Sequence, residues 1–283
     1  MFDLEQLEKD WHAAVEPGTA EERIACASRW NAYYSWLAAG QAEKPYTPSS
    51  QARRIVGYMC REKLLCPNDT VLDIGAGTGS YTLEMARFSR EVVAMDANKD
   101  CLEVLGRNAW EEELDNITEL PAFWESYNSP EKFDLVFSAM CPAICSTDEL
   151  RKIEHCSRRS AALVTVMRGS YEKHRREMIR RLGVRPKGMT TEAIYYYNAL
   201  YLMGRCPNMK CWSSEFQYPM SRQEVLTRFP VYFKVFGVDE EVSLPFLESY
   251  LDENAPDGVL MEECRMNLAL ISWDVPMENL QKK

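Results

Sequence analysis

The sequence predicts an α/β fold in which helices flank a doubly wound, mostly parallel sheet. Three observations support this prediction. Residues 70–74 form an apolar run rich in β-branched side chains, which is typical of a buried strand. Glycines at positions 75, 77 and 79 follow, and apolar residues then recur at helical spacing over 80–88. A strand, a glycine-rich turn and a helix in this order make the first βα unit of a nucleotide-binding domain.

Length and composition describe one large domain, or one domain with additions. The 283 residues suffice for a sizeable core, and 46% hydrophobic with 27% charged residues is ordinary for a globular protein.

The net charge of −10 disfavours nucleic acid as a partner, since a polyphosphate needs clustered Lys and Arg. The basic residues over 173–181 recur at helical spacing, so we interpret them as a solvated helix face.

The sequence shows no feature of a secreted or membrane protein. No apolar run approaches the roughly 20 residues that span a bilayer. The first residues, Met1–Glu5, lack the basic segment and the apolar stretch of a signal peptide. We therefore expect a cytoplasmic protein whose ten cysteines are reduced.

Two helices are expected before the first strand. Leu4, Leu7 and Trp11 recur at steps of three and four residues. A break at Pro17-Gly18 separates them from a second helical pattern over 21–39.

The remaining elements follow from the same two kinds of pattern. Short apolar runs predict strands, and apolar residues at steps of three and four predict helices. Further strands are expected at 91–96, 116–120, 133–138, 161–167, 215–218 and 267–273, and further helices at 50–65, 98–105, 147–156, 171–182, 191–203, 222–229 and 245–254.

The spacing of the glycines and two acids narrows the choice of ligand. The dinucleotide fingerprint is G-x-G-x-x-G, and Ser80 stands where its third glycine should be, which disfavours a nicotinamide dehydrogenase. Asp73 precedes the first glycine by two residues. Asp96 ends the second strand, where an acid can accept hydrogen bonds from both hydroxyls of a ribose.

With these residues the chain resembles the class I S-adenosylmethionine-dependent methyltransferases. Their first motif is similar to residues 71–79, their second-strand acid to Asp96 within 93–98, and their fourth strand to 133–138. These matches stand in the family's order and cover residues 50–170. The resemblance implies a Rossmann-like methyltransferase fold with seven strands, methyltransferase activity, and S-adenosyl-L-methionine as the cofactor.

The resemblance also implies a division of the chain. In small-molecule members of the family, aromatic residues before the first strand often cover the substrate pocket. Trp30, Tyr33 and Trp36 would do so here, or they would simply pack on the core. The implied parts are an N-terminal helical cover (1–48), a cofactor-binding core (49–169), a helical insertion or cap after the fifth strand (170–214) and the C-terminal end of the core sheet (215–283).

The resemblance assigns roles to the residues that match its motifs. The first motif would hold the methionine portion of the cofactor, and the second-strand acid would hold the ribose. After the third strand, where the family often has an acid for the adenine, Phe123 or Trp124 would stack on the ring, or Trp124 is a core residue. The loop after the fourth strand would meet the substrate and the sulfonium. The residues implied in cofactor binding are Asp73, Gly75, Ala76, Gly77, Thr78, Gly79, Asp96, Ala97, Phe123, Ser138 and Met140.

The catalytic residue stays open. Methyl transfer from a sulfonium is an in-line displacement that needs alignment more than a fixed set of side chains. The histidines, His12, His155 and His174, fit surface or helix positions better than the role of a base. Tyrosines and acids of the aromatic segments are equally possible as the catalytic base.

Cysteines flank the loop that follows the fourth strand. Cys141 and Cys145 form a C-x₃-C pair, and Cys206 and Cys211 lie in the insertion. Thiolates can bind zinc or a soft metalloid. The spacings do not match a zinc ribbon, however, and free cysteines usually behave as small buried hydrophobes. No metal site is predicted.

The favoured hypothesis is a methyltransferase that acts on a small molecule. Residues 139–144 lack the Asn/Asp-Pro-Pro-aromatic motif of family members that methylate amino groups of nucleic acid or protein. A protein or RNA methyltransferase is the alternative, and a basic concave surface beside the cofactor would favour it. A non-catalytic S-adenosylmethionine-binding protein is a further alternative, which an occluded acceptor pocket would favour. The exposed aromatic segments also fit a homodimer.

Overall fold

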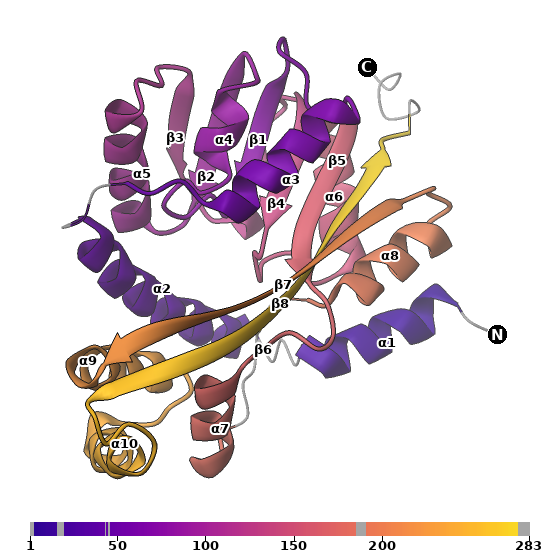
Figure 1. Cartoon of the computed structure of the whole chain (residues 1–283). Coiled ribbons are helices and arrows are strands. Elements are labelled where there is room, and N and C mark those ends of the chain that lie inside the picture. The colour runs from indigo at the N-terminus through magenta and orange to yellow at the C-terminus, as the bar shows by residue number, and fades with distance from the viewer. Residues whose placement is uncertain (1–2, 16–19, 43, 45, 185–190, 277–283) are drawn as a thin grey trace.

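A computed structural model describes residues 3–15, 20–42, 44, 46–184 and 191–276. Its sheet has the strand order β3-β2-β1-β4-β5-β8-β6, with β7 paired to the other side of β8 (Figure 1). None of the described helices has the length and apolar character that crossing a membrane requires. The strands are β1 (Thr70–Ile74), β2 (Glu91–Asp96), β3 (Ile117–Pro121), β4 (Phe133–Ala139), β5 (Ser157–Val166), β6 (Tyr171–Glu172), β7 (Asn208–Ser221) and β8 (Val259–Asp274). The helices are α1 (Leu4–Val15), α2 (Ala20–Ala42), α3 (Ser50–Arg61), α4 (Thr82–Ala86), α5 (Lys99–Glu111), the 3₁₀ turn η1 (Trp124–Ser126), α6 (Thr147–Cys156), α7 (Lys173–Arg181), α8 (Ala193–Leu202), α9 (Arg222–Lys234) and α10 (Glu240–Asn254).

β1 is the centre of the parallel part of the sheet. All five of its residues are buried, as expected for a parallel strand that is covered on both faces. β2 and β4 pair with it in parallel on its two sides. The strand order therefore reverses between β1 and β4, and such a reversal opens a crevice at the carboxyl ends of the strands.

Two apolar clusters cover the two faces of this sheet. Ile55 and Met59 of α3 pack with Met85 of α4 on one face. Leu150 of α6 and Leu200 of α8 pack on the other face, where Trp11 of α1 joins them. The doubly wound arrangement predicted from the sequence is therefore confirmed.

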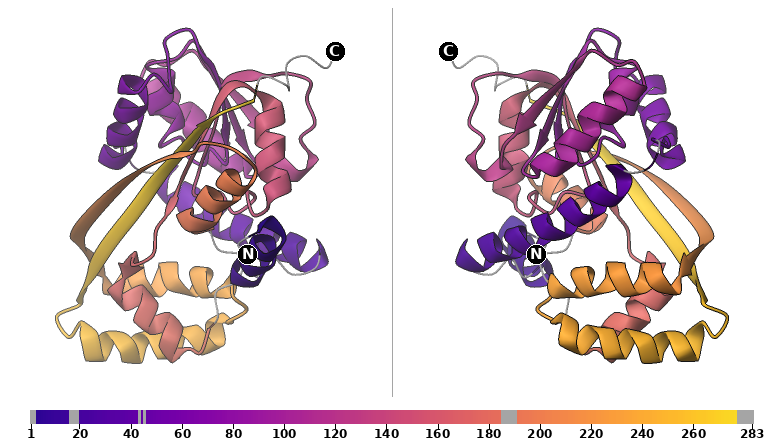
Figure 2. Two further views of the ribbon diagram at one scale, coloured as in Figure 1. Left: turned by 90° about the vertical axis from the view of Figure 1, so that its right-hand side faces the viewer. Right: turned by 90° about the vertical axis from the view of Figure 1, so that its left-hand side faces the viewer.

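The last strands leave the core and build a separate lobe. β8 is antiparallel to β5 over 268–274, and β7 is antiparallel to β8 along its whole length. The two strands continue outward as a ribbon to α7, α9 and α10, which lie below the core (Figures 1 and 2). Apolar side chains of these helices and of the ribbon form the lobe's own core, among them Met178, Met220, Phe229, Phe233, Leu247 and Leu260.

α2 lies between the core and the lobe. On one side its Ala38 packs with Cys101 and Val104 of α5. On another side its Tyr33 contacts Tyr232 of α9, with ring centroids 5.5 Å apart. This helix therefore joins the lobe to the edge of the sheet where β2 ends.

The C-terminal part differs in detail from the sequence prediction. The described sheet has eight strands rather than seven, because Tyr171 and Glu172 pair with β8 as a two-residue strand before α7 begins. β7 begins at Asn208, seven residues before the predicted start at 215. Most side chains of this first half are exposed, so no alternating apolar pattern marks it. The predicted boundary between 214 and 215 falls inside β7.

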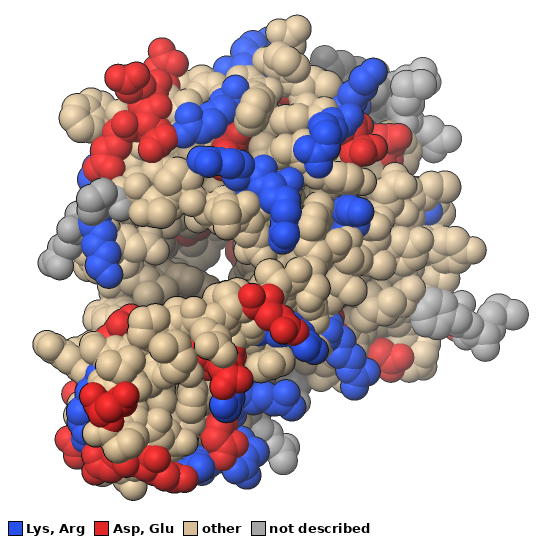
Figure 3. Space-filling view, viewed as in Figure 1, with Lys and Arg blue, Asp and Glu red and all other residues tan. Residues whose placement is uncertain are grey.

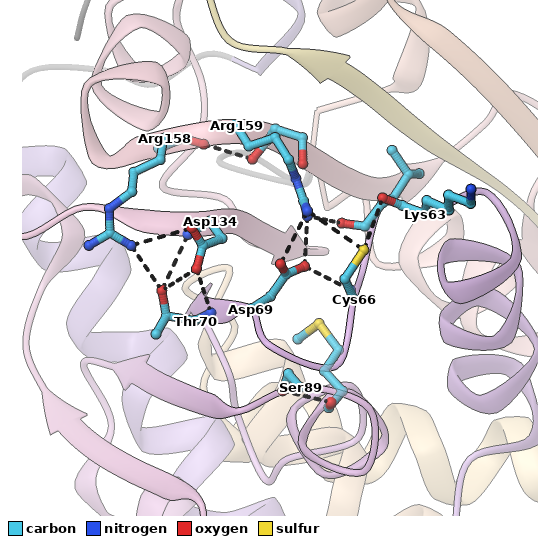
Figure 4. A network of polar contacts seen from close by, with 12 residues as sticks. Lys63, Cys66, Asp69, Thr70, Ser89, Asp134, Arg158 and Arg159 are labelled. Atoms are coloured by element: carbon cyan, nitrogen blue, oxygen red, sulfur yellow. Dashed lines mark hydrogen bonds and ion pairs between the residues drawn. The ribbon is translucent and has the colours of Figure 1, made fainter.

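Ion pairs fix the amino ends of the central strands, opposite the crevice (Figure 4). Arg159 of β5 donates to both carboxylate oxygens of Asp69, at 3.1 and 2.6 Å. Asp134 of β4 accepts from the backbone N–H and the hydroxyl of Thr70, both at 2.9 Å, and pairs with Arg158 at 3.5 Å. Burial would raise the pKa of Asp134, but the bonds from Thr70 and the charge of Arg158 hold it below its usual value.

This network predicts that Asp134→Asn lowers stability at neutral pH by about 1 kcal/mol, because hydrogen bonds to a charged acceptor become bonds to a neutral one. A carboxyl whose folded-state pKa is depressed stabilises the fold above its unfolded-state pKa, and this stabilisation is lost as the pH falls through the folded-state value. Urea unfolding of both proteins should therefore converge below about pH 4. The exposed Asp115→Asn is the control, and a pH-independent difference for Asp134→Asn would contradict the prediction.

Candidate functional site

The turn after β1 has a backbone that only glycine adopts without strain. Gly75, Gly77 and Gly79 have φ values of +75°, +56° and +94°. The N–H groups of Gly75 and Ala76 both donate to the carbonyl of Met95, at 2.9 and 3.0 Å. The turn is thereby fixed against the end of β2, at the mouth of the crevice.

Asp96 lies directly beside this turn. Its carboxylate accepts from the N–H of Gly77 and from the N–H of Asn98, both at 2.8 Å. Burial raises its pKa, although these backbone donors oppose the rise. A Cβ on Gly77 would find no other atom within 4 Å, so there is free space beside this part of the turn. The structure thus brings together the predicted glycine turn and the predicted second-strand acid.

Asp73 is buried beneath the turn. Its Oδ2 accepts a hydrogen bond of 2.6 Å from the hydroxyl of Thr82. Burial raises the pKa of Asp73 to about 7; the bond from Thr82 lowers it, and the charge of Asp96 raises it further. This carboxyl therefore titrates near neutral pH, and a positively charged ligand in the crevice would favour its ionised form.

The loop after β4 closes the other side of the crevice. The hydroxyl of Ser138 donates to the carbonyl of Ile74 at 2.8 Å, which ties β4 to β1. Met140 has a φ of +55°, and its N–H donates to the carbonyl of Val164 at 2.8 Å. The sulfur of Cys141 lies 2.8 Å from the position that a Cβ on Gly75 would take. The glycine turn and the β4 loop are therefore in direct contact.

Two helices, α8 and α1, support this loop from behind. The hydroxyl of Tyr196 on α8 donates to the carbonyl of Ile144 at 2.5 Å. The indole N–H of Trp11 on α1 donates to the hydroxyl of Thr191 at 3.0 Å. α1 therefore acts through the start of α8 rather than in the crevice itself.

The two aromatic residues after β3 have different surroundings. Trp124 is buried, its indole N–H donates to Glu149, and the ammonium of Lys152 lies 4.3 Å from its ring centroid. Phe123 is 48% exposed and follows Ala122, whose N–H donates to the carbonyl of Asp96 at 3.1 Å. Phe123 is therefore the aromatic side chain that is available beside Asp96, whereas Trp124 is part of the core. Ala97 is half-buried after Asp96.

Sequence reasoning did not single out Tyr34 of α2. The side chain of Asn98 donates to the carbonyl of Asn31 at 2.9 Å and to the hydroxyl of Ser35 at 3.1 Å, which fixes this part of α2 at the end of β2. Although Tyr34 is 40% exposed, the protein around its hydroxyl displaces water, and this desolvation, followed by the effects of Tyr33, Cys141 and Asp96, raises its pKa, so the hydroxyl stays protonated. The helical pattern included Tyr34 but gave no sign that this position turns towards Asp96.

The cysteines and histidines form no metal site in the described part of the chain. No group of three or more His, Cys, Asp or Glu side chains is close enough to hold a metal ion there. His174 lies in the lobe, where its Nδ1 is 2.7 Å from the hydroxyl of Tyr250. Burial raises the pKa of Cys141 to about 12, so this thiol stays protonated.

The core is similar to the methyltransferase domains of known proteins. Residues 71–161 match the family model of a methyltransferase domain. A probable cobalt-precorrin-6B C(15)-methyltransferase (decarboxylating) of Methanobrevibacter smithii is 35% identical over 74 residues, which are 26% of this chain and 38% of that protein. A probable ribosomal RNA small subunit methyltransferase A of Methanosphaera stadtmanae is 32% identical over 88 residues, which are 31% of this chain and 32% of that protein. The matches thus span about a third of these relatives' length.

Solved structures support the fold. A putative methyltransferase from Bacillus halodurans C-125 superposes with a TM-score of 0.53 at 16% identity, over 78% of this chain and 98% of that one. The YcgJ protein from Bacillus subtilis gives a TM-score of 0.52 at 16% identity, over 80% of this chain and 98% of that one. The predicted Rossmann-like methyltransferase fold is confirmed.

The contact between the two loops predicts unequal effects of two substitutions. Gly75→Ala must adopt a positive φ and also meets the sulfur of Cys141 at 2.8 Å, so we expect a loss of about 3 kcal/mol. Gly77→Ala has the positive φ without a contact within 4 Å and should lose about 1 kcal/mol. Chemical denaturation measures both, and equal losses would show that the β4 loop does not press on the turn.

Proposed function

We propose that this protein, whose core matches a methyltransferase domain, transfers a methyl group from S-adenosylmethionine to a small-molecule acceptor. The observation that carries the proposal is the meeting of the glycine turn, Asp96 and the β4 loop at one crevice. Such a crevice at the carboxyl ends of parallel strands is where open α/β sheets bind ligands.

The residues around the crevice fit the parts of this cofactor. The turn 75–79, with Thr78, and the buried Asp73 would hold the methionine portion. Asp96 would hold the ribose, with Ala97 and Phe123 at the adenine. Ser138 and Met140 would stand beside the sulfonium. When bound, the cofactor supplies a methyl carbon on a positively charged sulfur, which is the electrophile of the reaction.

The protein's own contribution is to orient the acceptor and exclude water. Tyr34 and Cys141 stay protonated at neutral pH and can therefore donate hydrogen bonds to an acceptor rather than remove its proton. α2 would cover the crevice, since it joins the end of β2 to the lobe. Alignment of a nucleophile with the methyl carbon, in a site shielded from water, supplies much of the acceleration of such a displacement.

A small acceptor is supported by charge, motif and shape. The chain carries a net charge of −10, and the loop after β4 lacks the Asn/Asp-Pro-Pro-aromatic motif. The molecular surface is hollowed between the core and the lobe, so the face with the strand ends is not filled (Figure 3). This hollow argues against the alternative of a binding protein without an acceptor pocket. The cysteines in the described residues are free, which supports a cytoplasmic location.

A basic concave surface does exist, as the protein or RNA alternative requires. A cavity of about 800 Å³ lies between α7 and α10 and includes Lys173, Arg176, Arg180 and Arg181 in its lining. Lys173 pairs with Glu263, however, and Arg180 and Arg181 both pair with Glu177. α7 also lies at the outer end of the lobe, away from the strand ends (Figure 1). Because of this position and the paired charges, we favour the small acceptor.

Calorimetric titration with S-adenosylmethionine and S-adenosylhomocysteine tests the cofactor site. We expect micromolar binding of both, and a loss of at least tenfold on Asp96→Ala, because the hydrogen bonds of a charged acceptor are removed. Asp115→Ala, the same change at the opposite edge of the domain, should bind as tightly as the wild type. An unchanged affinity for Asp96→Ala would disprove the assignment of this acid.

The pKa of Asp73 predicts a pH dependence of cofactor binding. A cationic ligand favours the ionised carboxyl, so binding should release protons below about pH 7, and the affinity should rise with pH until Asp73 is ionised in the free protein. Titrations at pH 6 and 8, in two buffers of different ionisation enthalpy, measure the proton release directly. Asp73→Asn keeps an acceptor for Thr82 and should abolish the release; if the release persists in this variant, another group is responsible.

A further inference from the structure

Basic side chains from two distant parts of the chain meet on the outer face of the core. Arg54 and Arg61 lie on α3, Lys210 lies on β7, and all three are exposed. Figure 3 shows Lys and Arg side chains gathered over α3, above the hollow between the core and the lobe. We call this region the α3–β7 basic surface; it consists of these three residues and the rings of Tyr58 and Trp212.

Two aromatic rings form the centre of this surface. Trp212 of β7 meets Tyr58 of α3 edge to face, with ring centroids 5.5 Å apart and an interplanar angle of 83°. The guanidinium carbon of Arg54 lies 5.9 Å from the ring centroid of Trp212. The guanidinium carbon of Arg61 and the ammonium of Lys210 lie 6.0 and 5.9 Å from the ring centroid of Tyr58. At these distances the electrons of each ring attract the cation beside it.

The three cations have no carboxylate partner in the described part of the chain. No Asp or Glu oxygen there lies within the 4.0 Å of an ion pair from Arg54, Arg61 or Lys210. Glu62 follows Arg61 directly, but it is exposed and pairs with none of the three. Two arginines of the lobe cavity, in contrast, both pair with Glu177. The α3–β7 basic surface is therefore a local excess of positive charge in a chain whose net charge is −10.

Contact with a ring leaves the hydrogen-bond donors of these cations free. A guanidinium attracted to an aromatic ring keeps its fork of N–H groups for a carboxylate or a phosphate. The contact also restricts the long side chain before a ligand arrives, so less conformational entropy is lost on binding. Tyr58 and Trp212 are half-buried against the apolar cluster under α3, and cations lie over both rings. A nucleobase would therefore compete with a cation in order to stack on either ring.

An exposed apolar side chain continues this surface along β7. Phe216 is 46% exposed and lies four residues after Trp212, so both side chains are on the same face of the strand. Its ring stacks with that of Tyr218, with centroids 6.3 Å apart. Aromatic residues and arginine are the residue types enriched at the centres of protein interfaces. This composition favours a protein as the partner of the surface, and the uncompensated charge favours an acidic one.

We propose that the α3–β7 basic surface binds an acidic, extended segment of a partner protein, with carboxylates on its three cations and an apolar side chain beside Phe216. Arg54 and Arg61 are seven residues apart on one helix, which is about 10 Å along its axis. About three residues of an extended segment span the same length. A nucleic acid fits less well, because its phosphates would continue beyond three cations over a chain of net charge −10. The proposal does not depend on methyl transfer.

Fluorescence anisotropy on the full chain tests the proposal with three labelled probes. The first is an octapeptide of six Glu and two Leu, the second is the same peptide with Gln in place of Glu, and the third is a single-stranded uridine octamer. We expect the acidic peptide to bind at least tenfold more tightly than the other two probes, and its binding to weaken as salt is added. Equal affinity for the Glu and Gln peptides, or tighter binding of the RNA, would overturn the proposal.

Variants then assign the binding to this surface. Arg54→Gln and Arg61→Gln each remove one exposed charge and should each weaken the acidic peptide about threefold, and the double variant should weaken it about tenfold. Arg151→Gln is the matched control, since Arg151 is an exposed arginine of α6, on the other face of the sheet, and pairs with Asp148. Full affinity in the double variant, or an equal loss for Arg151→Gln, would contradict the assignment.

The aromatic centre is tested by Trp212→Leu. This variant keeps all three charges but removes the ring beside Arg54, so the acidic peptide should bind about threefold more weakly. The midpoint of urea unfolding, measured for each variant, shows that the protein is folded under the conditions of the titration. Full affinity in a folded Trp212→Leu protein would show that charge alone binds the peptide, and the proposed aromatic centre would then be wrong.

Discussion

The left-handed backbone between β1 and α4 is the constraint on which the rest of the site depends. Three residues with positive φ reverse the chain directly after a buried strand, and the N–H groups of Gly75 and Ala76 donate to the carbonyl of Met95 in β2. This turn also sets the position of the carboxylate of Asp96, through the N–H of Gly77. Because Gly75 has no side chain, the β4 loop can approach it closely enough for the sulfur of Cys141 to lie where a Cβ would be. One short segment thus positions groups from three strands.

Two carboxyl groups with raised pKa values lie at the ends of β1 and β2. The burial that raises the pKa values of Asp73 and Asp96 makes their ionised forms costly without a cation. A cationic cofactor in the crevice would stabilise the ionised form of both carboxyl groups.

The sequence was most informative where one local pattern determines one local structure. The run 70–74 is buried on both faces, and β1 has the predicted bounds. The glycine turn and Asp96 were recognisable because the required backbone and the required carboxylate each allow few residue types. The location of Phe123 and Trp124 was not predictable in this way, since both are aromatic and adjacent. Only tertiary contacts, with Glu149 and Lys152, bury the second and leave the first exposed.

The arrangement of the lobe could not be predicted from such local patterns. Most side chains in the first half of β7 are exposed, so no burial pattern marks it as a strand; its pairing partner is β8, which begins 38 residues after β7 ends. The core of the lobe likewise combines residues from α2, α7, β7, α9, α10 and β8, and no spacing in the sequence connects them. What a sequence shows is periodicity along the chain, and these contacts join segments that are distant in the chain.

Neighbouring aromatic residues of α2 have different surroundings. Consecutive residues of an α-helix point about 100° apart, so neighbours in the sequence face different partners. Tyr33 is 6% exposed and packs in the core of the lobe, whereas Tyr34 is 40% exposed and lies on the side held by Asn98. Trp30, one turn earlier, stacks on Tyr34 and also contacts Tyr232 and Phe236 of α9. Trp30 therefore contacts both Tyr34, beside the crevice, and the α9 helix of the lobe.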